Sequence, residues 1–257
     1  DWPSFRGIRA SGVAEGFPTL TTWDIPKKQG LRWRTALDGL GTSSPIVWGD
    51  RVCITTAVSG KLDSNLKIGL YGDITSVEDN TSHTWKVVCL NKKTGRVVLD
   101  TTIQTGVPKV KRHTKSTHAN STLATDGNNL VAMFGSEGLY TLDMNGKVVW
   151  KKDLGVLDSG YYQVPQAQWE FGSSPIIHEG IVVIQADVQK DSFLAAFDIK
   201  DGRQLWRTPR QDVPTWSTPT IHKVGNQTQI LVNGWRNTGA YAFQTGREIG
   251  KINGGGD

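Results

Sequence analysis

Five residues of this sequence have side chains that could do chemistry together, because each lies just before a recurring Ser-Ser or Ser-Thr element. They are His118, Asn120, Trp169, Glu170 and Trp216. An imidazole, an amide and a carboxylate can bind a small polar ligand or a metal ion, and indole faces suit sugars and cations. The competing interpretation is structural: these groups could hydrogen-bond loops to one another, as buried polar groups must.

Four further residues are secondary candidates: His113, Asp187, Asn233 and Arg236. His113 lies in the basic cluster KVKRHTK, which could attract a phosphate or an acidic polysaccharide, although such a run in a loop is more often a solvated surface. The other three belong to loops that we expect on the same face, and Asp and Asn also form turns.

No catalytic residue can be assigned from motifs. The sequence contains no GxSxG elbow, HExxH helix signature or glycine-rich phosphate loop. It also lacks a CxxC pair or a Cys/His spacing typical of zinc, so spacing assigns no metal ligands.

Composition excludes two classes of protein. Hydrophobic residues make up 37% of the 257-residue chain, and no apolar run approaches the roughly 18 residues of a membrane span. The 29 basic residues are dispersed among 24 acidic ones, so nucleic-acid binding is not expected. Because the sequence begins at Asp1 without signal-peptide features, we expect a targeting peptide to have been removed or to lie outside it.

The elements that would position the candidate residues repeat along the chain. Each repeat has a hairpin with a turn glycine: NKKTGRVVL, DMNGKVVW, DIKDGRQLW and the degraded QTGREIG. A serine-rich element precedes each hairpin: SSPIV, STLAT, SSPII and STPTI. The separation from Pro175 to Gly202 equals that from Pro219 to Gly246, which favours a true structural repeat.

Each repeat contains four short apolar runs, clearest in SSPIIHE, IVVIQAD, FLAAFD and RQLWRT, and no amphipathic helical stripe. The pattern predicts an all-β fold, a β-propeller of four-stranded antiparallel blades in one domain over residues 1–257. The expected parts are an N-terminal segment with a closing strand at 1–41 and blades at 42–104, 120–155, 172–208 and 216–252. The first blade carries a polar insertion between Val58 and His83.

The segment QGLRWRTAL, residues 29–37, is similar to an outer strand without its inner partners. A lone outer strand commonly completes a blade begun at the other end of a propeller. Four blades and one orphan strand therefore predict a seven- or eight-bladed ring that continues beyond Asp257, or self-association of two copies to complete the ring. Trp33, Trp150 and Trp206 share one repeat position and should pack between adjacent blades.

Long loops are expected on one face of the propeller and short hairpin turns on the other. The long loops are residues 58–83, 104–120, 152–172 and 207–216, and binding residues usually lie on such loops. Cys53 and Cys89 lie in two β-like runs, and both a disulfide and two buried thiols remain open.

The hairpin pattern, together with DWPSFRG, GTSSPIV, HANSTLATDGNNLVAMFGSEGLYTLDMNGKVVW and GGGD, resembles the PQQ-like repeat β-propeller proteins, in particular a secreted bacterial subgroup. Nearly the whole chain carries the resemblance. It implies a periplasmic or secreted location. The family contains quinoprotein dehydrogenases and also an outer-membrane assembly lipoprotein that uses its blades as a scaffold.

Three functions remain open under this resemblance. The preferred one is a binding scaffold with a protein or glycan partner on the long-loop face. The second is a quinone- or metal-dependent oxidoreductase working through His118 and Glu170, and the third is a carbohydrate-binding module using Trp169 and Trp216. The resemblance implies PQQ with calcium as a conceivable cofactor, but quinoprotein alcohol dehydrogenases hold the quinone against a disulfide of adjacent cysteines, which this sequence lacks. Soluble glucose dehydrogenases with the same quinone also lack that pair, and no cofactor is predicted.

Overall fold

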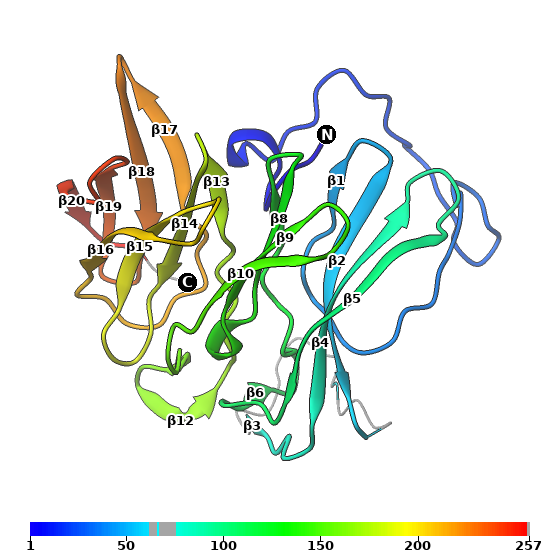
Figure 1. Cartoon of the computed structure of the whole chain (residues 1–257), viewed down its shortest axis with the longest axis horizontal. Helices are drawn as coiled ribbons and strands as arrows, with labels where there is room; N and C mark the ends of the chain where they lie inside the picture. The colour runs from blue at the N-terminus through cyan, green and yellow to red at the C-terminus, as the bar shows by residue number, and fades with distance from the viewer. Residues whose placement is uncertain (62–65, 67–75, 256–257) are drawn as a thin grey trace.

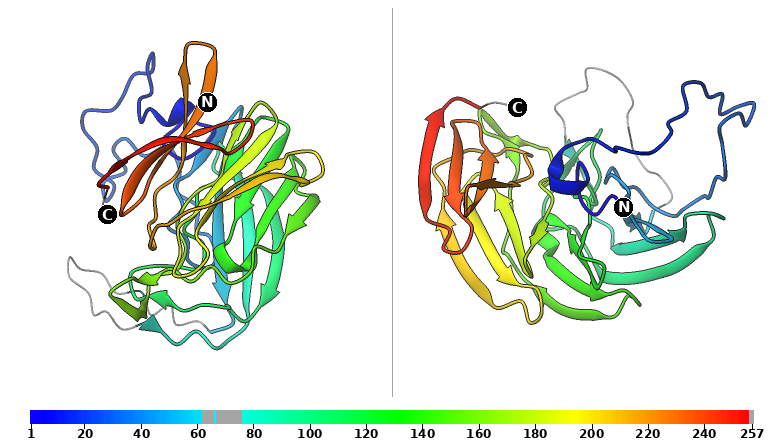
Figure 2. Two further views of the ribbon diagram at one scale, coloured as in Figure 1. Left: turned by 90° about the vertical axis from the view of Figure 1, so that its left-hand side faces the viewer. Right: turned by 90° about the horizontal axis from the view of Figure 1, so that it is seen from above.

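Four antiparallel sheets stand side by side as sectors of an open fan (Figure 1; Figure 2, right). They are seen in a computed structural model that describes residues 1–61, 66 and 76–255. Helical structure in these residues is limited to the short 3-10 turns η1 (Ile8–Ala10) and η2 (Gly135–Glu137). The all-β prediction is confirmed, and no helix in the described part of the chain is long and apolar enough to cross a membrane.

Each sheet is a meander of consecutive strands, as the repeat pattern predicts. The first contains β1 (Ile46–Trp48), β2 (Arg51–Ser59), β4 (His83–Asn91) and β5 (Val97–Gly106). The second contains β7 (Ala124–Thr125), β8 (Asn129–Met133), β9 (Leu139–Asp143) and β10 (Val148–Lys152). The third contains β13 (Ile176–His178), β14 (Ile181–Ala186), β15 (Phe193–Asp198) and β16 (Gln204–Pro209). The fourth contains β17 (Thr220–Val224), β18 (Gln227–Asn233), β19 (Asn237–Ala242) and β20 (Glu248–Asn253).

The cores lie between neighbouring sheets, which pack face to face. Strands β14 and β15 are buried along almost their whole length because both faces of the third sheet are covered. This explains their near-continuous apolar sequences, because a strand with one face in solvent would instead alternate apolar and polar residues. The outer strand β20 is exposed at every residue.

A tryptophan contacts the hairpin turn of a neighbouring sheet at three places, from the outer strands β10 and β16 and from the N-terminal segment. Trp150 donates its indole N–H to the backbone carbonyl of Ile199, at 2.7 Å, and its ring lies on Gly202. A Cβ atom at Gly202 would come within 2.6 Å of that ring, and φ there is +70°, so only glycine fits. The arrangement recurs at Trp33 with Gly95 and Lys92, and at Trp206 with Gly246 and Phe243. The prediction that these tryptophans pack between blades is confirmed.

The segment at residues 29–37 corrects one prediction. It forms no strand beyond an isolated bridge between Asp24 and Gln29, although Trp33 and Thr35 make the side-chain contacts of an outer strand, the latter through a 2.7 Å bond to the carbonyl of Gly95. A strand needs a neighbouring backbone to complete its hydrogen bonds, and this segment belongs to none of the sheets formed by the described residues.

The described parts of the long loops gather on one face, at the bottom of Figure 1, as predicted. We call this surface the long-loop face; its ordered parts are β3 (Ser76–Val77) paired with β6 (Arg112–His113), and β11 (Gly160–Tyr161) paired with β12 (Val164–Gln168). The hydroxyl of Ser76 accepts a 2.9 Å bond from the backbone N–H of Gln168 and so links the two hairpins. The insertion of the first blade lies between β2 and β4, and its central part falls outside the described residues.

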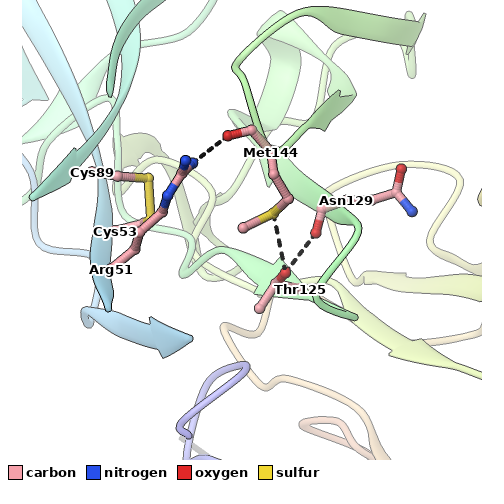
Figure 3. Close-up of a disulfide and its surroundings, with 6 residues drawn as sticks. All are labelled: Arg51, Cys53, Cys89, Thr125, Asn129 and Met144. Carbon is pink, nitrogen blue, oxygen red and sulfur yellow. Dashed lines mark hydrogen bonds between the residues drawn. A yellow bond between two sulfur atoms is a disulfide. The ribbon is translucent and has the colours of Figure 1, made fainter. Parts of the chain in front are cut away.

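Cys53 and Cys89 form a disulfide across β2 and β4 (Figure 3). Both half-cystines are buried in the core between the first and second sheets. Beside them Arg51 reaches across to donate to the backbone carbonyl of Met144 in the second sheet. Of the two states that the sequence left open, the structure therefore has the disulfide.

Candidate functional site

The five main candidate residues come together through direct contacts. Nδ1 of His118 lies 2.6 Å from Oε2 of Glu170, and the indole N–H of Trp216 donates to the backbone carbonyl of Glu170 at 2.8 Å. The ring of Trp169 lies 6.0 Å from that of Trp216. The side-chain amide of Asn120 donates to the carbonyl of the residue after Glu170, at 3.0 Å. These residues converge as expected because each precedes the innermost strand region of its sheet.

His118 lies between two carboxylates, only one of which the sequence pointed to. Its Nε2 is 3.2 Å from Oδ2 of Asp79, a residue of the first-blade insertion. The same oxygen accepts a 2.6 Å bond from Nε of Arg112. His118, Arg112 and Glu170 are all buried, so the cluster is held away from bulk water.

The cluster shifts the ionisation of its members. Burial would lower the pKa of His118, but its hydrogen bonds to Asp79 and Glu170, with their negative charges, raise the pKa to about 9. Burial likewise opposes ionisation of Asp79, yet the bond from His118 and the charge of Arg112 bring the pKa of Asp79 down to about 2. In this arrangement His118 is an imidazolium between two carboxylates at neutral pH.

Glu170 has a strained backbone. Its φ of +66° lies in the left-handed region, which is uncommon for residues other than glycine. The surroundings support it: Oε1 accepts the 3.0 Å bond of the N–H of Phe171, and Gly135 leaves room for both residues, since a Cβ there would lie 2.8 Å from Phe171. This conformation directs the Glu170 carboxylate at His118.

His83 stands beside His118, with the two rings edge to face and their centroids 5.1 Å apart. Nδ1 of His83 is 2.9 Å from the carbonyl oxygen of Thr81 and must donate, because a carbonyl only accepts. Burial lowers the pKa of His83, so the ring is neutral at neutral pH. Both histidines and Asp79 line a cavity of about 320 Å³ whose wall also includes Thr117 and Lys61.

Glu137 adds a third buried carboxyl group near this cluster. Its Oε1 accepts the backbone N–H of Lys109 at 2.8 Å. Burial raises the pKa of Glu137 to about 7, and the negative charge of Glu170 acts in the same direction, against the bond from Lys109.

We expect the free energy of unfolding of Glu137→Gln to rise relative to that of the parent as the pH increases. The pKa of Glu137 is about 7 in the folded chain, against 4.5 for an ordinary glutamate, so the stabilisation by the protonated group is present below pH 4.5 and is lost as the pH rises through about 7. The loss amounts to about 3 kcal/mol. Urea unfolding of both chains at about pH 5 and about pH 8 measures it.

The matched control is Glu15→Gln, which removes an exposed carboxylate. Its difference from the parent should not change between the two pH values. An equally constant difference for Glu137→Gln would show that the buried carboxyl group titrates normally.

The basic cluster around His113 corrects a second prediction. Arg112 and His113 are buried, and the expectation of a solvated surface is wrong for both. Countercharges from the insertion explain this, since Asp79 pairs with Arg112 and Glu78 with Lys111. The ring of His113 is stacked on Trp169, at 4.4 Å and an interplanar angle of 7°.

The remaining secondary candidates lie at a second polar cluster, between the third and fourth sheets, in which Asp187 is buried whereas Asn233 and Arg236 are exposed. Asp187 binds Arg210 through both oxygens, at 2.6 and 3.0 Å. The backbone carbonyl of Asn233 accepts a bond from Gln185, and the N–H of Arg236 donates to Asp212. The three residues are thus near one another, held largely by contacts within the fold.

Sequence reasoning missed Asp79, His83, Arg112 and Glu137 as members of the site. None of them occupies a repeated position next to a serine-rich element. The polar insertion and the basic cluster KVKRHTK marked where Asp79, His83 and Arg112 could enter, but not that they would reach His118, and no sequence signal pointed to Glu137.

The residues present do not fit the PQQ and calcium pair of the quinoprotein dehydrogenases. The half-cystines Cys53 and Cys89 are buried in a core between sheets, where they offer no platform to a ligand. Calcium prefers oxygen ligands, whereas this cluster presents imidazole nitrogens and the guanidinium of Arg112 beside its carboxylates.

The sequence matches a protein-family model described as outer membrane protein assembly factor BamB, over residues 10–154 and again over residues 85–253. Two overlapping matches are what a repeated sequence produces. No curated protein matches the sequence.

Solved structures with the same arrangement include BamB from Moraxella catarrhalis, which is 15% identical with a TM-score of 0.54, over 86% of this chain and 54% of that one. A quinohemoprotein alcohol dehydrogenase from Pseudomonas putida HK5 is 16% identical with a TM-score of 0.53, over 88% of this chain and 36% of that one. The chain therefore spans about half the length of the first and about a third of the second. At these identities the likeness shows the fold alone, and it confirms the propeller prediction.

Proposed function

The chain belongs to the family described as outer membrane protein assembly factor BamB, whose members are PQQ-like repeat propellers, and from this premise we propose that it is an extracytoplasmic scaffold that binds a protein partner on its long-loop face. The buried disulfide agrees with an oxidising compartment. The family description names a protein that acts in assembly, which favours a protein partner over a glycan.

The observation that carries the proposal is a set of partly exposed aromatic side chains on ordered loops. Trp169 is 37% exposed although its ring stacks on His113. Tyr162 lies between Tyr161 and Trp235, with ring centroids 5.3 and 5.2 Å away. Tyrosine and tryptophan are enriched at the centres of protein interfaces, because they bury a large area at a small loss of side-chain entropy.

The loops beneath these rings are held in place, which favours recognition of a partner by a preformed surface. β12 is tied to β3 through Ser76 and Gln168, and Gln168 also donates to Asp158 at 2.8 Å. A surface ordered before binding loses less conformational entropy when the partner docks.

Site-specific photo-cross-linking tests the proposal. A photoreactive phenylalanine analogue replaces Tyr162 in the full chain, and the matched control places it at Lys200, an exposed turn residue at the end of a hairpin on the opposite face. We expect a cross-linked protein in an envelope extract from the Tyr162 position and none from Lys200. Adding Trp169→Ala should reduce the product at least about tenfold, since loss of an interface tryptophan often removes 2 kcal/mol or more.

Two results would contradict the scaffold proposal. One is a cross-link at Lys200 with none at Tyr162, which would place the partner on the other face. The second is a product that contains only another copy of this chain. Circular dichroism of each variant checks that the fold is retained.

A further inference from the structure

Two histidines of the candidate site have the hydrogen bonds that metal-bound histidines need. Nδ1 of His83 donates to the carbonyl of Thr81, and Nδ1 of His118 faces the carboxylate of Glu170 at 2.6 Å. Metal-bound imidazoles commonly donate their second nitrogen to a carbonyl or a carboxylate, which orients the ring and directs the other nitrogen at the ion. In both residues Nε2 is the nitrogen left for an ion.

Asp79 supplies an oxygen at the same point. One ligand atom each from Asp79, His83 and His118 can be chosen so that all three lie within 4.8 Å of one another. Nε2 of His118 and Oδ2 of Asp79 are already 3.2 Å apart, close to the separation of two ligands that share a zinc ion at about 2.1 Å. A side-chain movement of up to about 1.5 Å would bring the third ligand to that separation.

The charges and the open side of the cluster also suit a cation. With neutral imidazoles, the carboxylates of Asp79 and Glu170 and that of Asp38 in the cavity wall outnumber the guanidinium of Arg112 and the ammonium of Lys61. Oδ2 of Asp79 can keep its bond from Arg112 while it binds an ion beside His118, because a carboxylate oxygen has two lone pairs. The adjoining cavity of about 320 Å³ leaves room for water or a small ligand at the remaining coordination positions.

We propose that Asp79, His83 and His118 are the ligands of a divalent cation of the zinc class, with Glu170 as the residue that positions His118. The ion takes the place of the Nε2 proton that His118 shares with Asp79 in the metal-free chain, while the Nδ1 bond to Glu170 is kept. Two nitrogens and one oxygen select a transition metal over calcium or magnesium.

Calorimetric titration tests the site. The full chain, without a histidine tag and stripped with EDTA, is titrated with ZnCl₂, and absorption of added Co²⁺ reports on nitrogen ligation. We expect one ion per chain and visible Co²⁺ bands that Zn²⁺ abolishes. Absence of both heat and bands, or binding of Ca²⁺ with none of Zn²⁺, would overturn the proposal.

Variants identify the ligands. His83→Asn keeps an N–H for the carbonyl of Thr81 but removes Nε2, and it should weaken Zn²⁺ binding more than about 100-fold, beyond the loss that follows removal of an outer partner. Glu170→Gln should weaken it by about tenfold or more. The control is His222→Ala, an exposed histidine of β17, which should bind as the parent does.

The variants test whether these three residues are the ligands. The proposed ligand set would be excluded if a folded His83→Asn chain bound Zn²⁺ as tightly as the parent. It would also be excluded if His222→Ala lost as much Zn²⁺ affinity as His83→Asn. If His83→Asn does not fold, Asp79→Asn is measured in its place, with the same expected loss. The scaffold proposal is independent of these results, because its cross-links arise at Tyr162.

Discussion

Replacing Trp150 with alanine should lower the free energy of unfolding by about 3–5 kcal/mol. The side chain is 8% exposed and lies in the core between the second and third sheets. The substitution removes the ring from Gly202 and leaves the carbonyl of Ile199 without its 2.7 Å bond. Because each sheet contacts mainly its neighbours, damage to one interface weakens the whole array. Urea unfolding followed by tryptophan fluorescence and circular dichroism measures the loss.

Two comparisons sharpen this expectation. Trp23→Ala removes an indole that is 66% exposed and should change stability by less than about 0.5 kcal/mol. Gly202→Ala would push a Cβ against the Trp150 ring, so the loss in the Trp150→Ala, Gly202→Ala double variant should be smaller than the sum of the single losses. Strict additivity, or a loss at Trp150 no larger than at Trp23, would contradict the proposed packing.

Neutralising Asp187 should be nearly as damaging, at about 3–5 kcal/mol. Asp187→Asn removes the bidentate partner of the buried Arg210 guanidinium and leaves it the longer contact with Asp212, at 3.4 Å. Arg210 also donates to the hydroxyl of Tyr241 at 2.8 Å, in the fourth sheet, so the pair ties the third sheet to the fourth. The loss is expected because a buried charge that loses its closest countercharge is poorly compensated for its desolvation. Denaturant unfolding at neutral pH gives its size.

The matched control is Glu179→Gln, which neutralises an exposed carboxylate paired with Lys223 at 3.9 Å. A surface pair contributes less than about 1 kcal/mol, so this change should be close to neutral. Replacing both partners, Asp187→Leu with Arg210→Met, should recover part of the loss, since no buried guanidinium then lacks its bidentate partner. A loss at Asp187 as small as that at Glu179 would show that the ion pair is not what holds these sheets together.

The sequence predicted the parts of the fold that repeat. The turn glycines, the apolar runs and the recurrent tryptophans identified four sheets and the contacts of Trp150 and Trp206. It also predicted that His118 and Glu170 would meet, because both precede the first strand region of a sheet. These predictions succeeded because repetition and periodicity report backbone geometry, which the local sequence largely determines.

The backbone state of residues 29–37 could not be predicted in this way. Its sequence is that of an outer strand, and Trp33 makes the expected contact, but a strand also depends on a neighbouring backbone. The burial of His113 could not be predicted either. A basic run is buried only when residues distant in the sequence supply countercharges, as Asp79 does for Arg112, and a covering ring, as Trp169 does for His113.

The sequence by itself thus determined the propeller architecture, the long-loop face and the convergence of His118 with Glu170. Only the tertiary structure decided that Asp79 and His83 complete the cluster, that Arg112 pairs inside it and that Cys53 is bonded to Cys89. The physical reason is that the cluster is built by side chains from an insertion and from loops that do not repeat. Their contacts depend on how those segments fold against the sheets, which sequence periodicity does not predict.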